Sequence, residues 1–207
     1  MMSPTEQSSS PLPAPLILAS TSAYRRALLE RLRLPFTVQS PQTDETPHPG
    51  EAPLALALRL AEAKARAVTS TAPGSWVIGS DQVCTCEGRM LGKPGHRAAA
   101  IGQLQMLRGR HSMFYTALAL VAPDGSALVR AVTTTVRMRA LSDAQIEAYV
   151  QAEQPYDCAG SAKSEGLGIA LMESIHSDDP TALVGLPLIA LCDMLLSSGY
   201  PLLRPVR

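Results

Sequence analysis

The chain has 207 residues, which fits one domain, and 46% of them are apolar, enough to bury a core. Charged residues make up only 17% and the formal net charge is zero, so no overall field draws the chain to nucleic acid or to anionic lipid. No apolar run approaches the roughly 18 residues needed to cross a membrane. We expect a disordered tail over residues 1–15, rich in Ser and Pro and unlike a secretory signal, and a single domain over residues 16–203.

Periodicity and turn residues predict helices that alternate with strands. In chain order we expect a strand at 16–19, a helix at 23–32, a strand at 36–38, a Pro-rich loop at 40–53, a helix at 53–68, a strand at 76–79, a hairpin of 83–86 and 89–91, a helix at 97–107, strands at 113–121 and 127–138, a helix at 142–152, a strand at 167–175 and a helix at 187–197. The hairpin in the middle argues against a purely parallel sheet, so we predict an α/β or α+β fold with a mixed sheet.

The second predicted helix has the clearest apolar stripe. We expect this stripe to face the core, and it is formed by Leu54, Leu58, Ala61, Ala65 and Val68. Lys64 lies on the flank of the stripe, where a lysine by default keeps its ammonium in water.

The four cysteines do not form a recognisable metal site. Cys84 and Cys86 make a C-x-C, but no second pair and no nearby histidine completes a zinc-binding pattern with Cys158 or Cys192. We interpret all four as reduced, small apolar residues, which fits a cytoplasmic protein.

Asp81 is the most informative charged residue. It follows the apolar run Trp76-Val77-Ile78 and sits in Gly79-Ser80-Asp81-Gln82. A strand that ends by delivering one carboxylate places a catalytic or metal-binding acid on a rigid element.

Other charges gather in turns. Arg25 and Arg26 fall in the first turn of a helix, where cations oppose the helix dipole unless an anion binds there beside Ser20 and Ser22. The remaining candidates are Glu45 in the Pro-rich loop, Lys64, Lys93 between Gly92 and Pro94, and Lys163 and Glu165 in a loop of small residues. Taken singly, each of these residues is equally well interpreted as a solvated charge on the protein surface. Together they supply the carboxylates and cations that would hold and attack a metal-bound polyphosphate.

Several common nucleotide and hydrolase motifs are absent from the sequence. It contains no G-x-x-x-x-G-K-[ST], no G-x-G-x-x-G and no G-x-S-x-G. A P-loop, a dinucleotide-binding fold and a serine hydrolase elbow are therefore unsupported.

The ordered motifs of the chain resemble the Maf family of nucleoside triphosphate pyrophosphatases, and most of all its branch that hydrolyses 7-methyl-GTP. The resemblance runs from Leu16 to about Gly199. The motifs that carry it are Leu18-Ala19-Ser20-Thr21-Ser22 with Arg25-Arg26, Asp44-Glu45-Thr46, Ile78-Gly79-Ser80-Asp81-Gln82, Gly92-Lys93-Pro94, Phe114-Tyr115-Thr116, Asp157-Cys158-Ala159-Gly160-Ser161, Lys163-Ser164-Glu165-Gly166, and Asp179-Pro180 through Gly185-Leu186-Pro187. Ala23, Ala117 and Ala162 depart from the usual pattern, and Ala162 thins the wall near Glu165.

This resemblance implies a curved mixed sheet flanked by helices, with two lobes around a cleft, as in inosine triphosphate pyrophosphatases. It also implies cleavage between the α- and β-phosphates, a divalent cation (Mg²⁺ or Mn²⁺) and a homodimer. Carried over by position, Asp81 and Lys93 are catalytic, with Asp81 as proton acceptor, and Glu45 and Asp81 bind the metal. Substrate binding falls to Ser20, Arg25, Arg26, Lys64 and Lys163, and base preference to Tyr24, Gln82 and Glu165.

Three alternatives stay open at this point. One is the same reaction on dTTP or UTP. Another is a nucleotide-binding regulator of cell division without useful turnover, and the third is a binding module that needs no metal. The acids Asp81 and Glu45, together with Lys93, favour an enzyme, since a sensor does not require a base.

Overall fold

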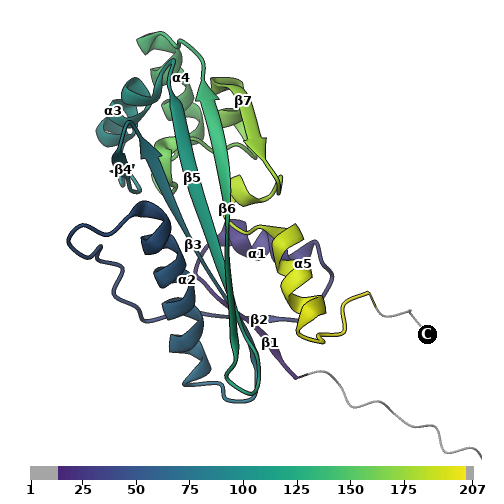
Figure 1. The fold of residues 1–207 in the computed structure, drawn as a ribbon. Helices are drawn as coiled ribbons and strands as arrows, with labels where there is room; N and C mark the ends of the chain where they lie inside the picture. The colour runs from purple at the N-terminus through teal and green to yellow at the C-terminus, as the bar shows by residue number, and fades with distance from the viewer. Residues whose placement is uncertain (1–13, 204–207) are drawn as a thin grey trace, which may run out of the picture.

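The computed structural model describes residues 14–203, and in them a mixed seven-stranded sheet is packed between helices (Figure 1). The strands are β1 (Leu16–Ala19), β2 (Thr37–Gln39), β3 (Trp76–Cys86), β4 (Arg89–Leu91), β5 (His111–Val121), β6 (Ala127–Met138) and β7 (Met172–Ser177). The α-helices are α1 (Ala23–Glu30), α2 (Pro53–Thr69), α3 (Arg97–Leu107), α4 (Asp143–Glu153) and α5 (Leu188–Ser197). Three short 3-10 helices complete the described part: η1 (Ala159–Ser161), η2 (Leu167–Leu171) and η3 (Ala182–Val184).

The sheet combines parallel and antiparallel pairs, which confirms the predicted mixed α/β architecture. The strand order is β2-β1-β3-β5-β6-β7, and β4 also pairs with β3. The pairs β1–β2 and β1–β3 are parallel, while β3–β4, β3–β5, β5–β6 and β6–β7 are antiparallel. The expected hairpin at Glu87 and Gly88 is present, and both residues have positive φ, as a two-residue turn of type I′ requires.

The helices divide the molecule into two lobes. α2 packs on one face of the sheet, against the odd-numbered residues of β3. On the other face, Ile78 packs with α1 and α5, whereas Cys84 and Cys86 pack with α3 and α4. Figure 1 shows α3 and α4 near the upper end of the long strands, and α1 and α5 further down, beside the middle and lower half. The middle of β3 therefore lies between two separate cores.

One edge of β3 is interrupted at the same point. β5 pairs with β3 from Val77 to Thr85 along one edge. On the other edge, β1 pairs only as far as Gly79, and β4 pairs only from Cys84 onward. Residues 80–83 have no strand beside them on that edge, so side chains from both faces of β3 can reach one common opening.

Three expectations need correction. β3 does not stop before Asp81, because its pairing with β5 carries the strand through to Cys86, and Asp81 lies mid-strand. The strand predicted at 167–175 begins only at Met172, since the glycines near its start favour the tight 3-10 turn of η2. In α2, Leu54 is exposed and Lys64 is buried, because the buried stripe is rotated toward Leu56 and Leu60.

Most of the predicted tail lies outside the described residues. Its last two residues, Ala14 and Pro15, are described, and the Pro15 carbonyl accepts a hydrogen bond from the Trp76 amide at 2.8 Å. Among residues 14–203, no helix is both long and apolar enough to cross a bilayer.

Gly79 sets how closely α2 approaches the sheet. A Cβ built at this position would lie 2.2 Å from the Ala61 carbonyl oxygen and 2.7 Å from the Ala65 nitrogen. Both are backbone atoms of α2, so a side chain could be accommodated only if the helix moved outward. The glycine thus brings α2 near enough for Lys64 to reach β3.

We expect Gly79→Ala to lower the free energy of unfolding by about 1–3 kcal/mol, the usual cost of overpacking a rigid core. Denaturant unfolding measures it. Gly102→Ala is the matched control, because nothing lies within 4 Å of its added Cβ and the residue is within α3. That change should stabilise the protein by about 0.5–1 kcal/mol. Equal stability of Gly79→Ala and wild type would contradict the close packing.

Candidate active site

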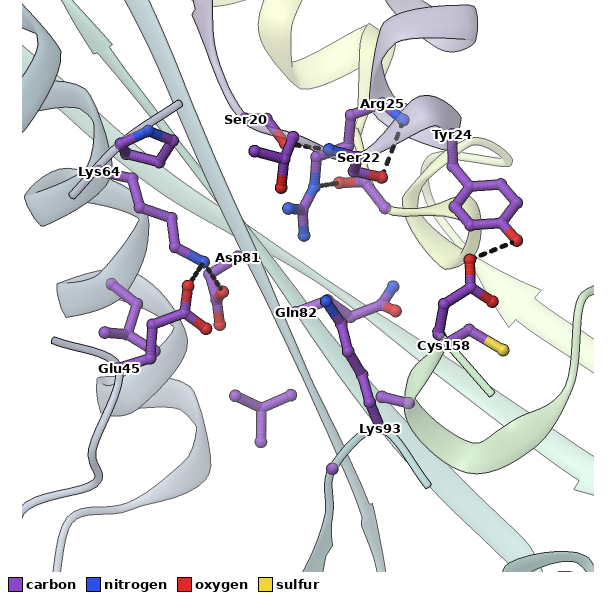
Figure 2. A pocket seen from close by; sticks show the side chains of 18 of the residues that line it. Ser20, Ser22, Tyr24, Arg25, Glu45, Lys64, Asp81, Gln82, Lys93 and Cys158 are labelled. Atoms are coloured by element: carbon purple, nitrogen blue, oxygen red, sulfur yellow. Dashed lines mark hydrogen bonds and ion pairs between the residues drawn. The ribbon is translucent and has the colours of Figure 1, made fainter. Parts of the chain in front are cut away.

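A cleft of about 650 Å³ opens at the interrupted edge of β3. The residues that line it come from the turn between β1 and α1, the loop before α2, α2 itself, the middle of β3, the turn after β4, and the loops before η1 and after η3. Eight of the residues predicted for the site line it: Ser20, Tyr24, Arg25, Glu45, Lys64, Asp81, Gln82 and Lys93. Their roles stay predictions, but the structure brings them into one cavity (Figure 2).

Lys64 joins two carboxylates at the base of the cleft. Its Nζ donates to Asp81 Oδ1 at 2.6 Å and lies 2.8 Å from Glu45 Oε1. The Lys64 and Asp81 side chains are only 8% and 10% exposed, whereas Glu45 is 59% exposed. Figure 2 shows the ammonium between the two acids. The burial of this pair places one carboxylate at a fixed point, with a second on a solvent-facing loop beside it.

Arg25 is held in the cleft by its own helix and by a neighbouring loop. Ser22 caps α1 and accepts from the Arg25 amide at 3.4 Å, while the Arg25 Nε donates to the Gly185 carbonyl at 2.8 Å. Burial lowers the pKa of the Arg25 guanidinium, and the carboxylates of Asp81 and Glu45 oppose that shift. These neighbours place the arginine in the same electrostatic field as the Lys64 cluster.

The loop that carries Gly185 is itself pinned to the start of α5. The Asp179 carboxylate is buried and accepts from the Ile189 and Ala190 amides at 2.7 and 3.2 Å, as a capping residue would. Its other oxygen accepts from Thr181. The Asp179-to-Pro187 motif therefore acts structurally, by positioning the carbonyl that orients Arg25.

Gln82 extends from the opposite face of β3 to Asp81, as neighbours on a strand do. Its amide nitrogen donates to the carbonyls of Ala182 and Leu183 at 3.1 and 3.0 Å and to the Thr116 hydroxyl at 2.9 Å. Carbonyl oxygens can only accept, so the side-chain orientation is determined. The amide oxygen is the polar atom left for a ligand, and it is an acceptor.

Three of the predicted site residues do not line the cleft. Arg26 projects away from it and pairs with Glu30 at 3.0 Å, because successive helix residues point about 100° apart. Lys163 and Glu165 lie in the loop after η1. Neither is among the lining residues, although the Lys163 Nζ lies 5.9 Å from the centre of the Tyr24 ring, which does line the cleft. Their assigned functions stay predictions.

Asp157 lines the cleft and was not predicted as a site residue. The Tyr24 hydroxyl donates to its Oδ2 at 3.0 Å, a contact between residues 133 positions apart. The sequence offered one signal, since Asp157 begins the small-residue motif that ends at Ser161. Nothing in that motif revealed that it folds against α1.

Cys158 is the cysteine that lines the cleft among the described residues. Burial raises the pKa of Cys158, which lines the cleft, to about 12, so its thiol is protonated at neutral pH. Cys84 and Cys86 are buried in one core cluster, in agreement with their interpretation as apolar residues.

A family model described as Maf-like protein matches residues 15–198. The chain belongs to the Maf family. Among curated Maf relatives, the 7-methyl-GTP pyrophosphatase of Burkholderia pseudomallei (strain 1710b) is 59% identical over 194 residues, covering 92% of this chain and 90% of the relative. The protein of the same name from Paraburkholderia xenovorans (strain LB400) is 60% identical over 195 residues, covering 92% and 95%.

Solved structures are more distant from this Maf chain. A HAM1 protein from Coxiella burnetii aligns with a TM-score of 0.49 and 17% identity, covering 89% of this chain and 99% of the other. A nucleoside-triphosphatase, or dITP/XTP pyrophosphatase, from Mycobacterium abscessus aligns with a TM-score of 0.42 and 18% identity, covering 90% and 99%. Neither similarity carries a conclusion, so the fold class rests on the strand pairing.

The donors in this Maf cleft suit a hard divalent cation. Within residues 14–203 no three His, Cys, Asp or Glu side chains gather to hold a metal ion. Glu45 and Asp81 nevertheless approach one another closely enough to share the Lys64 ammonium. Mg²⁺ is commonly bound by one or two carboxylates together with substrate phosphates, and this donor set fits that pattern.

A salt bridge holds the loop that carries Glu45 against α2. Arg59 donates from Nε to Glu51 Oε1 at 2.6 Å and from a second nitrogen to Oε2 at 2.7 Å, and it also donates to the Thr46 carbonyl at 3.1 Å. Hydrogen bonding from Arg59 lowers the pKa of Glu51 from 4.5 to about 2. The pair is therefore complete above pH 4.5 and is lost as the pH falls through about 2.

We expect Glu51→Gln to loosen residues 40–52 and to speed their cleavage in limited proteolysis at neutral pH, with little change in melting temperature. Acidification of the wild type toward pH 2 should loosen the same segment, because protonated Glu51 no longer attracts Arg59 as strongly. Glu62→Gln is the control, since it breaks only an exposed helical pair with Arg66. Equal cleavage of the two variants would mean that the salt bridge does not hold the loop.

Proposed function

We propose that this protein is a nucleoside triphosphate pyrophosphatase that prefers 7-methyl-GTP and releases the nucleoside monophosphate and pyrophosphate. Support for the reaction comes from the family and from the names of its 59–60% identical relatives. Support from this chain is one observation: a buried Lys64–Asp81 pair lies beside Glu45 in a cleft that also contains Arg25 and Lys93.

The acidic and the basic side chains of the cleft suit different tasks. The carboxylates of Asp81 and Glu45 lie at the base of the cleft, where they suit a proton and a cation. Arg25 and Lys93 approach from different segments of the chain, where they suit the negative charge of a triphosphate. A divalent cation bound by Glu45, Asp81 and the phosphates would neutralise phosphate charge and hold the chain of phosphates in place.

Asp81 is the residue we assign as general base. It lies on the rigid middle of β3, and Lys64 fixes one of its oxygens. The carboxylate would take a proton from the attacking water as the bond between the α- and β-phosphates breaks and pyrophosphate leaves. Lys64 would stabilise the carboxylate in its charged form, and the one hydrogen that it does not direct at Asp81 or Glu45 is available to a phosphate oxygen.

Arg25 and Lys93 would stabilise the charge that develops on the phosphates. Arg25 is oriented in advance by the Gly185 carbonyl, so little rearrangement is needed when a phosphate arrives. Lys93 lies in the turn just after β4. Its side chain extends into the cleft at the open edge of β3 (Figure 2). We assign Ser20 to the same set, as a hydroxyl donor at the end of β1.

Tyr24 and Gln82 are the residues on the cleft wall that suit a base. The Tyr24 ring offers an aromatic face, and a positively charged 7-methylguanine ring gains a cation–π contact there of about 0.5–2 kcal/mol. The free oxygen of Gln82 accepts from N–H donors such as those on the guanine edge. A cytoplasmic location, which reduced cysteines fit, and a homodimer, which follows from the family resemblance alone, are also part of this proposal.

The proposal is tested by pyrophosphate release from 7-methyl-GTP, GTP, dTTP and UTP, each with Mg²⁺, with Mn²⁺ and in excess EDTA. We expect the highest kcat/KM for 7-methyl-GTP, no release in EDTA, and recovery when either metal is restored. A preference for dTTP or UTP would refute the assigned base. Full release after exhaustive chelation would refute the metal, and no release from any nucleotide would refute the activity.

Asp81→Asn should abolish turnover while preserving the fold, because asparagine is nearly isosteric and can still accept from Lys64. General-base catalysis is normally worth about 10²–10⁴-fold in rate, so we expect a loss in kcat of at least that size. Asp193→Asn is the control, because Asp193 lies on α5, is 62% exposed and is not among the lining residues. A loss of threefold or less, about 0.7 kcal/mol in activation free energy, would rule out the base role.

A further inference from the structure

Asp157 forms a corner of the cleft with an aromatic ring and a lysine. Its Oδ2 accepts from the Tyr24 hydroxyl at 3.0 Å, and its Oδ1 lies 3.6 Å from Lys163 Nζ. The Lys163 ammonium lies 5.9 Å from the centre of the Tyr24 ring and donates to the Glu153 carbonyl at 3.3 Å. We call Tyr24, Asp157 and Lys163 the aromatic corner.

The ring and the carboxylate of the aromatic corner both attract positive charge. The Lys163 ammonium already lies within the roughly 6 Å at which a cation is attracted to an aromatic face. Burial acts to lower the pKa of Lys163, but the Tyr24 hydroxyl and the Asp157 carboxylate more than offset it, so the pKa is raised. Burial also raises the pKa of Tyr24, which keeps its hydroxyl as a donor to Asp157 at neutral pH.

The carboxylate of the corner remains open to a ligand. The Asp157 side chain is 59% exposed and lines the cleft, whereas Lys163 is 15% exposed and is not among the lining residues. Only one of the Asp157 oxygens accepts from Tyr24, and each carboxylate oxygen can accept more than one hydrogen bond. A ligand in the cleft can therefore meet the tyrosine ring and a negative charge together.

Glu165 does not provide this combination. It is exposed, it is not among the residues that line the cleft, and its Oε2 is near the hydroxyl of its neighbour Ser164 at 3.5 Å. The loop around it is held in place by the Glu153 carboxylate, which accepts from the Leu167 amide at 3.1 Å. A Cβ added at Gly168 would come 2.5 Å from the Lys163 carbonyl oxygen, so the two ends of this loop pack closely on one another.

We infer that Asp157 is a specificity-determining residue that selects a positively charged purine base, with Tyr24 as the ring on which that base stacks. The inference rests on the proposed function, in which the substrate is a 7-methylguanine nucleotide. Methylation at N7 gives the ring a positive charge, and only the charged base gains from a carboxylate beyond the hydrogen bonds that neutral guanine also makes. Asp157 would therefore separate the methylated from the unmethylated nucleotide.

Equilibrium binding of 7-methyl-GMP and GMP by calorimetry tests the inference without requiring turnover. Asp157→Asn keeps the shape and removes the charge, and we expect it to lower the preference for 7-methyl-GMP about tenfold while changing the affinity for GMP by less than about threefold. Asp143→Asn is the matched control, because it makes the same change at a carboxylate that is 64% exposed and is not among the lining residues, and it should leave the preference within about twofold of wild type. If Asp157→Asn weakens both nucleotides equally, or if the loss follows Glu165→Gln, the inference is wrong.

Two further variants separate charge from packing. Tyr24→Phe keeps the ring but frees Asp157, so the preference should fall less than in Asp157→Asn. Lys163→Met removes the competing cation, and the preference for the methylated nucleotide should rise. If Lys163→Met instead weakens both nucleotides alike, the ammonium and not the carboxylate governs binding there, and the inference fails.

The inference and the proposed function can fail separately. If the wild type prefers 7-methyl-GMP through Asp157 but releases no pyrophosphate from 7-methyl-GTP, the proposed function fails and the inference stands. If the wild type releases pyrophosphate but binds 7-methyl-GMP and GMP equally, the inference fails while the activity remains.

Discussion

The interrupted edge of β3 is the constraint on which the site depends. A central strand normally has neighbours on both edges, which satisfy its backbone groups and bury its side chains. β3 has β5 along one edge, but β1 and β4 leave residues 80–83 uncovered on the other. The opening lies between the two helical cores, so it is backed by rigid structure on either side. It also explains how Asp81 and Gln82, which point to opposite faces, both line one cleft.

The buried pair of Lys64 and Asp81 is better understood through position than through stability. A buried ion pair often contributes little net stability, because removing two charges from water offsets most of their attraction. Removal of one partner is costly, typically about 3–5 kcal/mol, since the other charge is left buried and unpaired. The pair therefore strongly favours one position of α2 on the face of β3. The close packing of α2 on Gly79 favours the same position of the helix. Packing and charge therefore both fix where the Asp81 carboxylate lies.

Local pattern was sufficient wherever neighbours in sequence are neighbours in space. The hairpin at Glu87 and Gly88 and the helix α3 match their predicted positions, because each is specified by residues within a few positions. The pattern was insufficient where distant packing decided. The stripe of α2 is rotated because the helix lies against Gly79 of β3 and the alanines of β5. The strand continues through Asp81 because β5 supplies partners as far as Thr85. Neither contact can be predicted from the residues that flank α2 or β3 in the sequence.

By itself, the sequence determined the family, the order of the elements and the types of side chain available for chemistry, because motifs and short-range periodicity are written along the chain. The tertiary structure alone decided which of those side chains meet. It joined Glu45 and Asp81 through Lys64, left Arg26 on the surface with Glu30, and brought Asp157 to Tyr24 across 133 positions. The physical reason is that these contacts depend on how α1, α2 and the late loops pack around the interrupted edge of β3, and packing between distant segments leaves no periodic signal in the sequence.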